Sequence, residues 1–286
     1  MAALLGSEAW YQPGYTIARL MTQVRTAGTI GSGSDQERAW RRVGRNSGYV
    51  VAAGLLVGTV LFLLDSIDAL DASPEYHVTN AGPLQDEANF YVAYFAHQHH
   101  IMWDIVVRDT LLPIAFVALI FLSLAVRNLV GPDRPKAQLM TTLFVVGGIL
   151  SALSDLLYLG GTEYWRETSW AAQPASRMVA IGRSADVVTA LAHWPEAAGF
   201  VTLAAGLFYL GALCRTQAEL PSRLGLLAYL EALLLVGIAL ADVMHADMAY
   251  DILSLMTGAL IGPAVGIWLG LHIGRGSSRL ADSAVE

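Results

Sequence analysis

The sequence predicts an all-α membrane protein, a polytopic bundle of six transmembrane helices with additional interfacial helices. Six apolar stretches of about 20 residues divide a chain of 286 residues that is 55% apolar and only 14% charged. The polar segments between them alternate in sign, and one set holds 13 of the 17 Lys and Arg residues. The other set, with its adjoining helix ends, holds 16 of the 24 Asp and Glu residues and six of the seven histidines. This alternation is typical of a membrane protein oriented by the positive-inside rule.

The six stretches define a membrane domain over 48–273. Its predicted spans are 48–66, 105–126, 138–159, 195–213, 224–244 and 252–273. The rule predicts a cell inner-membrane protein with both termini in the cytoplasm, because the basic segments are 1–47, 127–137, 214–223 and 274–286. Ser34 or Asp35 is the expected N-cap of a helix that leads into the first span.

Four polar segments have predicted structure of their own. Residues 1–47 are an amphipathic segment and linker, with a helix over 14–27 on the inner surface and a flexible joint at 31–34. Residues 274–286 form a cytoplasmic tail. In the outer segment 67–104, a helix is expected to begin near Pro83. In the outer segment 160–194, the stretch 178–192 is predicted to be interfacial or re-entrant, because Arg183 and Asp186 interrupt it.

Small residues predict close helix packing. The last span carries a glycine at every fourth position, and the first span carries two more: Gly258, Gly262, Gly266, Gly270, Gly54 and Gly58. Glycine lets a neighbouring backbone approach closely in lipid, where apolar burial gives little net drive. The same grooves could receive a membrane protein partner or a second copy of the chain. Pro263, inside the glycine series, is expected to bend the span and release a carbonyl.

Two segments near the carboxyl end carry a resemblance. The stretches Leu220–Ile238 and Gly262–Arg275, the latter reading GPAVGIWLGLHIGR, resemble the last two spans of an uncharacterised group of six-span bacterial membrane proteins. The resemblance rests on apolar and small residues. It implies a six-helix fold and a membrane location, and no activity.

One group of polar residues has metal-ligand spacing. His97, His100, Asp104 and Arg108 follow one another at intervals of three, four and four, which places them on one face of a single helix. Two imidazoles and a carboxylate suit iron or zinc, and copper is a further candidate. Asp104 and Arg108 could instead pair with each other. His193 and His245 are expected at the same outer level. A haem is not favoured, because only these two histidines could face each other.

Acids in the spans form a second group of candidates. Asp155 shares a face with Gly147 and Ser151, where neighbouring helices are expected, so its carboxyl should avoid lipid. Glu231 and Asp242 are eleven residues apart, close to three turns, and therefore lie on one helical stripe. Glu196 lies at the start of the fourth predicted span. Together with Asp155, Glu231 and Asp242 it could line a path for protons or cations.

These observations leave three hypotheses for function. The leading one is an outward-facing histidine and carboxylate site that binds or transports a cation, a proton or a small polar ligand. The second is a membrane-embedded metalloenzyme that uses His97, His100 and Asp104. The third is an accessory or assembly subunit of a membrane complex. No basic stripe indicates nucleic acid, and no glycine-rich phosphate loop, GxSxG or HExxH motif is present in the sequence.

Overall fold

The computed structural model describes residues 33–70, 82–167, 173–244 and 246–282. The predicted helix over 14–27 and His245 lie outside these residues. Gly33 and Ser34, half of the predicted joint, belong to a helix instead. Contacts divide the chain into two units, Met1–Trp40 and Arg41–Glu286. The second unit holds the bundle.

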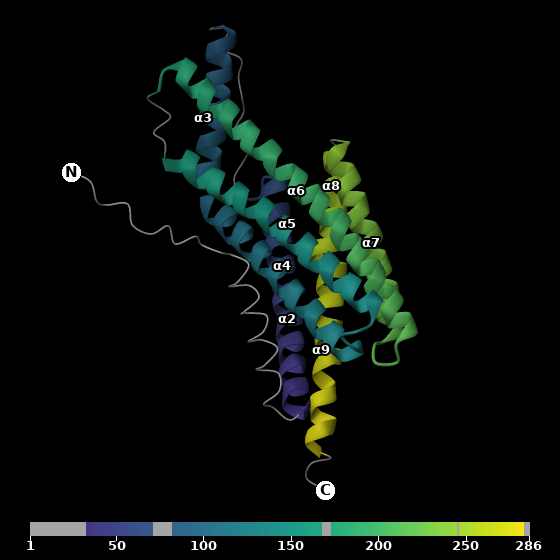
Figure 1. Ribbon diagram of the computed structural model, residues 1–286. Helices are drawn as coiled ribbons and strands as arrows, with labels where there is room; N and C mark the ends of the chain where they lie inside the picture. Colours follow the sequence, from purple (N-terminus) through teal and green to yellow (C-terminus); the bar gives the residue numbers. More distant parts are fainter. Residues whose placement is uncertain (1–32, 71–81, 168–172, 245, 283–286) are drawn as a thin grey trace, which may run out of the picture. The chain divides into compact units, whose positions relative to one another are not determined.

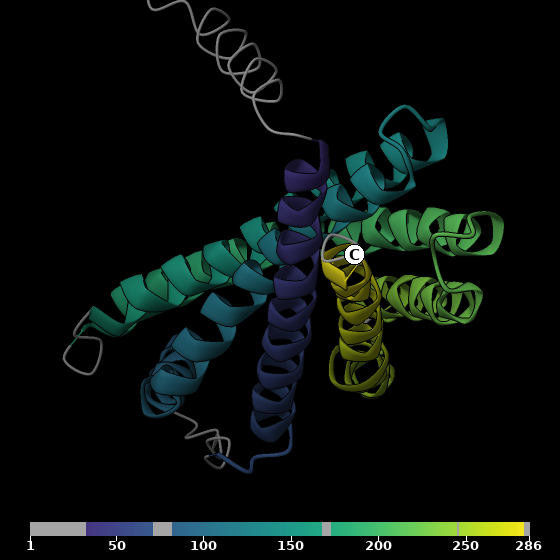
Figure 2. The ribbon, with the colours of Figure 1, turned by 90° about the horizontal axis from the view of Figure 1, so that it is seen from below.

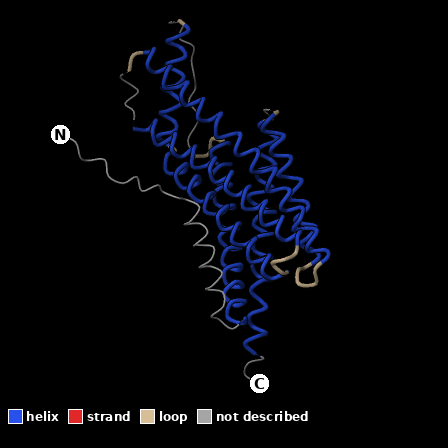
Figure 3. Tube along the Cα trace, viewed as in Figure 1, coloured by secondary structure: helices blue, strands red, loops and turns tan. Residues whose placement is uncertain are grey.

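The described residues are helical and contain no strand, which confirms the predicted fold class (Figure 3). The elements are α2 (Gly33–Ser66), α3 (Pro83–His100), α4 (Met102–Val130), α5 (Pro135–Glu167), α6 (Ala175–Thr216), α7 (Ser222–Val243), α8 (Asp247–Ser254), the π-helix η2 (Leu255–Ile261) and α9 (Gly262–Asp282) (Figure 1). Six spans, with α8, η2 and α9 counted as one, are long and apolar enough to cross a membrane. The chain is therefore a multi-pass membrane protein. The predicted stretches lie within these helices, apart from Met244, which follows α7.

In the second unit, the spans follow one another around a ring in sequence order. Helices α4 and α5, α5 and α6, and α6 and α7 pack along much of their length, and α7 packs on η2 and α9. Glycines on α2 close the ring. A Cβ added to Gly48 would overlap the carbonyl oxygen of Gly266 on α9, and one on Gly54 would lie 2.8 Å from the Cβ of Ala115 on α4. Figure 2 shows α2 beside α9 from below.

The two ends of the ring differ in charge. At one end, Arg41 Nη1 donates to the Ile273 carbonyl at 3.1 Å, and His272 Nε2 lies 2.8 Å from the Glu219 carbonyl oxygen. This end, called the basic end, also holds the connections at 131–134 and 217–221. The other end, called the acidic end, holds the end of α2 at Ser66, the end of α7 at Val243 and the start of α8 at Asp247 (Figure 1).

Helix α6 corrects the prediction for 178–192. Instead of a separate interfacial helix, this stretch is the beginning of a continuous 42-residue helix that runs through Pro195. At 1.5 Å per residue α6 is about 63 Å long, roughly twice the hydrocarbon core of a bilayer. Its first part packs on α3 through a buried cluster that includes Tyr91, Phe95 and Met178. That apolar partner explains why the stretch needs no membrane surface. We call this pair, α3 and 175–190, the α3–α6 extension.

Two hydrogen-bonded contacts fix the α3–α6 extension. Tyr91 donates its hydroxyl to Asp186 at 2.6 Å, and Arg183 donates from Nε and Nη2 to the two oxygens of Glu87 at 2.8 and 2.9 Å. Because its two hydrogen bonds from Arg183 favour the charged form, the pKa of Glu87 is held below its ordinary value. Burial, together with the hydrogen bond to Asp186, raises the pKa of Tyr91 to about 12.

Span six leaves α-helical geometry beside its proline. Pro263 has no N–H to donate, and its ring crowds the carbonyl four residues earlier. The preceding residues Leu255–Ile261 form a π-helix, whose wider turns relieve such crowding. The expected irregularity therefore takes the form of a widened stretch within span six.

Candidate functional site

A cavity of about 700 Å³ lies inside the ring, and all six spans line it. Among the described residues, its lining holds eight carboxylic acids, one arginine and one histidine. The acids are Asp65, Asp109, Asp155, Glu196, Glu231, Asp242, Asp247 and Asp251. Carboxylates inside a membrane protein are costly and mark paths or sites for ligands more often than they stabilise the fold.

The cavity reaches the surface at the acidic end. Ser66 and Asp247, which lie at the helix ends there, line it and are exposed. Toward the basic end its lining is apolar and tightly packed: Met140 is 0% exposed, Val126 1% and Leu269 2%. The cavity is therefore a vestibule that opens at one end and is closed by apolar side chains at the other.

Arg108 organises one side of the acidic end. Its Nε donates to Asp109 Oδ1 at 2.8 Å, and its Nη1 lies 3.6 Å from Asp65 Oδ2 on α2. Its guanidinium carbon lies 5.9 Å from the ring centre of Phe62. Asp104, one turn before Arg108, is completely buried and lies within electrostatic range of it. One guanidinium thus faces three carboxyl groups.

Two further polar pairs complete the acidic end. His193 Nδ1 on α6 lies 3.2 Å from Asp242 Oδ1 on α7. Tyr250 on α8 donates its hydroxyl to Glu196 on α6 at 3.0 Å. The Tyr158 ring on α5 and the His193 ring are nearly perpendicular, with a centroid distance of 6.4 Å. Five polar side chains on four helices therefore share the mouth of the cavity.

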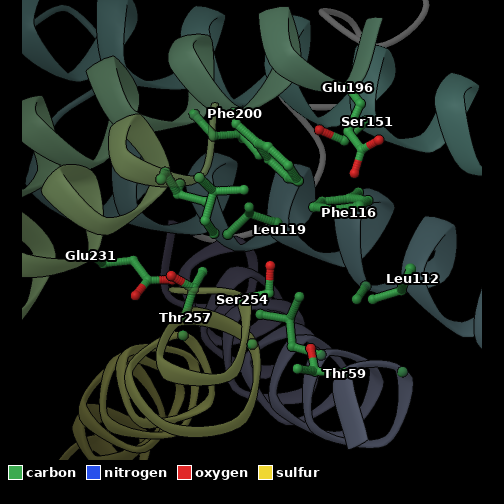
Figure 4. Close-up of a pocket in the computed structure, with 18 of the residues that line it drawn as sticks. Thr59, Leu112, Phe116, Leu119, Ser151, Glu196, Phe200, Glu231, Ser254 and Thr257 are labelled. Atoms are coloured by element: carbon green, nitrogen blue, oxygen red, sulfur yellow. The ribbon is translucent and has the colours of Figure 1, made fainter. Parts of the chain in front are cut away.

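Asp155 and Ser151 occupy the α5 wall. Asp155 lies within electrostatic range of Glu196 and Asp109, so three carboxyl groups approach one another there. Among the described residues, Asp155 Oδ2 and Ser151 Oγ have no hydrogen-bond partner. Ser151 and Glu196 both line the cavity (Figure 4). These are polar atoms that a ligand could bind.

Glu231 lies deeper, halfway along α7. The residue is 4% exposed, and its Oε2 has no hydrogen-bond partner among the described residues. A Cβ added to Gly262 would lie 3.0 Å from its Oε1, so Gly262 on α9 lies close to this carboxyl. Figure 4 shows Glu231 pointing toward Thr257 of η2, with Ser254 and Thr59 beyond it.

Aromatic and aliphatic side chains separate the two polar regions. Phe116 and Leu119 on α4 and Phe200 on α6 lie between Glu196 and Glu231 in Figure 4. The cavity therefore has an acidic mouth, an apolar middle and one buried acid beyond it.

The histidine and aspartate face predicted for metal binding is divided by the structure. The prediction of one helix over His97, His100, Asp104 and Arg108 is wrong, because the chain leaves α geometry at Ile101 (φ −93°, ψ 14°). The break lets α3 pack on α6 while α4 enters the ring. His97 Nε2 lies 3.8 Å from Asp65 Oδ1, whereas His100, the last residue of α3, is exposed.

No metal cluster is found in the part of the chain that the structure describes: nowhere do three His, Cys, Asp or Glu side chains converge as metal ligands. Of the predicted ligands, His97 and Asp104 both lie beside the Asp65–Arg108 pair, whereas His100 is exposed and His193 lies on α6. His193 pairs with Asp242, and Asp104 belongs to the Arg108 group.

The structure does bring the predicted acids together. Asp155, Glu196, Glu231 and Asp242 all line the same cavity. Sequence reasoning also indicated Asp247, at the outer end of span five, but missed Asp109, Tyr250, Asp251, Thr59 and Thr257. Asp109 directly follows Arg108, and the sequence does not show that its side chain faces the cavity inside the ring. The hydroxyl-bearing residues gave a weaker signal, because serine and threonine are ordinary in membrane spans.

Comparison with protein-family models, with curated proteins and with solved structures finds no match to this chain. The resemblance of its last two spans to a six-span bacterial group stays a prediction.

Proposed function

We propose that this chain is an inner-membrane protein whose cavity binds a cation that enters from the acidic end. The observation that carries the proposal is the charge of the lining, eight acids against one arginine among the described residues. Coulombic attraction of a cation is strong in such a site, because the low-dielectric walls screen it poorly. An anion would be repelled by these acids, because the lining holds only one guanidinium and no ammonium group among the described residues.

The proposal gives the mouth residues distinct roles. Arg108 is already engaged by Asp65 and Asp109, so it balances part of the negative charge and holds that wall in place. Asp155 and Glu196 carry the charge that remains for a ligand. The hydroxyl of Tyr250 orients Glu196 through their hydrogen bond.

Calorimetry measures the binding of tetramethylammonium to the full chain in lipid nanodiscs. Asp155→Asn and Glu196→Gln are each expected to weaken binding about tenfold or more, since a hydrogen bond or contact to a charged group contributes about 1.5–3 kcal/mol. Asp133→Asn is the control, because Asp133 is exposed at the basic end. Wild-type protein without affinity for tetramethylammonium, sodium or potassium would overturn the proposal.

Transport is a second candidate function, and Glu231 is the observation that favours it. This acid lies in the same cavity, beyond the apolar middle, and beside a π-helix, an element that often marks functional sites. A cation or proton that passed the apolar middle would meet it next. We expect reconstituted vesicles to show cation-dependent flux that Glu231→Gln abolishes while binding at the mouth persists. Flux that is unchanged in Glu231→Gln would argue against this path.

A further inference from the structure

The size of the cavity restricts the ligand. About 700 Å³ falls within the range of 300–1,000 Å³ that is typical of sites for drug-sized molecules. A bare metal ion needs a few oxygen atoms at 2–2.6 Å, and a proton needs one acceptor. The volume is therefore that of an organic molecule.

The lining restricts the chemistry of that molecule. Apart from Glu231, its acids are gathered at the mouth, whereas the middle is formed by aromatic and branched aliphatic side chains such as Phe116, which is 8% exposed. A small, strongly hydrated cation gains nothing from such walls. An apolar body gains about 25 cal/mol for each Å² that it removes from water.

Aromatic faces in this cavity also attract positive charge. The Arg108 guanidinium lies over the Phe62 ring at 5.9 Å, so one wall of the cavity already holds a cation against an aromatic ring. Glu231 is an independent indication, because its buried carboxyl faces the far end of the same space and its Oε2 has no partner among the described residues. Both ends of the cavity thus favour positive charge or hydrogen-bond donors over anions.

We propose that the ligand is an amphiphilic organic cation, whose charged group lies near Asp155 and Glu196 and whose apolar body lies between Phe62, Phe116 and Phe200. This inference rests on the proposed function and names the ligand class of that site. The acidic mouth, where Ser66 and Asp247 are exposed, is the route of entry.

Three probes separate charge from apolar contact. Tetraphenylphosphonium carries a positive charge on an aromatic body, tetraphenylborate has the same shape with a negative charge, and tetramethylphosphonium keeps the positive charge without the rings. Each is titrated by calorimetry into the full chain in nanodiscs, with empty nanodiscs as the reference for partition into lipid. We expect tetraphenylphosphonium to bind at least tenfold more tightly than either of the other two.

Matched variants place the site. Phe200→Ala should weaken tetraphenylphosphonium binding about tenfold and leave tetramethylphosphonium unchanged. Phe208→Ala, on the same helix but 57% exposed on its outer side, should leave both unchanged. Glu196→Gln should weaken both cations.

The outcomes distinguish the two proposals. Equal binding of the two phosphonium ions, or a Phe200→Ala variant that binds tetraphenylphosphonium like wild type, would overturn the organic-cation inference and leave the cation site standing. Tetraphenylborate binding as tightly as tetraphenylphosphonium would overturn both, because the acids would then exert no selection for charge.

Discussion

Arg108 is the residue on which the acidic end of the cavity depends. It lies inside a membrane span, and its guanidinium is shared by Asp65 on α2 and Asp109 on its own helix, with Asp104 one turn away. It stabilises the fold by compensating negative charge, because Asp104 and Asp109 are buried and would otherwise lie there without a counter-ion.

We predict that Arg108→Gln destabilises the protein by roughly 3–5 kcal/mol, the range for removal of one partner from a buried ion pair. Unfolding in mixed micelles measures the loss. Arg134→Gln, at an exposed site at the basic end, should change stability by less than about 0.5 kcal/mol. Adding Asp109→Asn to Arg108→Gln should restore part of the loss. Equal stability of the two arginine variants would contradict the role given to Arg108.

Glycines offer a second prediction at the residue scale. A Cβ added to Gly48 would overlap the Gly266 carbonyl oxygen and lie 2.9 Å from the Gly270 Cα, and backbone atoms cannot move aside. Gly48→Ala should therefore cost about 1–3 kcal/mol through overpacking. Gly160→Ala is the matched control, because nothing lies within 4 Å of an added Cβ there. It should be neutral, or stabilising by up to about 1 kcal/mol. Similar effects of the two variants would show that α2 and α9 can separate freely.

At the scale of elements, the α3–α6 extension depends on one close contact. A Cβ added to Gly182 would overlap the Tyr91 ring, so α3 can lie against α6 only while residue 182 is glycine. Gly182→Val is expected to detach α3 and make the segment before it more sensitive to protease, with the six spans intact. Limited proteolysis measures this. Ser184→Val, exposed on the same helix, is the control and should leave the cleavage pattern unchanged.

The same extension should respond to pH in two ranges. The pKa of Glu87 is lowered by Arg183, so its contribution is complete above the ordinary value of 4.5 and is lost as the pH falls through the lowered pKa. This pair is exposed, so the effect is small. The pKa of Tyr91 is raised from 10 to about 12, so its contribution is lost as the pH rises across that interval. The protease sensitivity of α3 should therefore increase at both low and high pH. Tyr91→Phe should abolish the increase at high pH.

At the scale of the whole molecule, a ring of six helices encloses a cavity that is open at one end. The spans direct their acids inward and expose many large apolar residues on the outside, as Leu226 and Leu233 on α7 show with 72% and 70% exposure. The arrangement lets acids from six helices meet without contact with lipid. Closure toward the basic end by Met140 and Leu269 fits a binding protein, or a carrier seen with one end open.

The sequence predicted the fold because each membrane span is a stretch of about 20 apolar residues, a signal long enough to be recognised without knowledge of tertiary contacts. It also indicated Asp155, Glu196, Glu231 and Asp242, since an acid inside a span must face protein or water. It did not indicate the break at Ile101 or the unbroken course of α6 through Pro195. Both follow from the packing of α3 on α6, a contact between residues about 90 apart in the chain that no local pattern encodes.

The orientation of the ring is the last prediction, and the charge distribution supports it. Lys and Arg near span ends are retained in the cytoplasm, so the basic end should face inward and the acidic mouth outward. Ala69→Cys, exposed at the acidic end, should react with a membrane-impermeant maleimide on cells with a permeabilised outer membrane. Asp133→Cys should react only after lysis. The native Cys214 is buried, with 1% exposure, and should not react with the maleimide in either experiment. The reverse pattern would place the cavity mouth in the cytoplasm, and the ligand would then have to come from inside the cell.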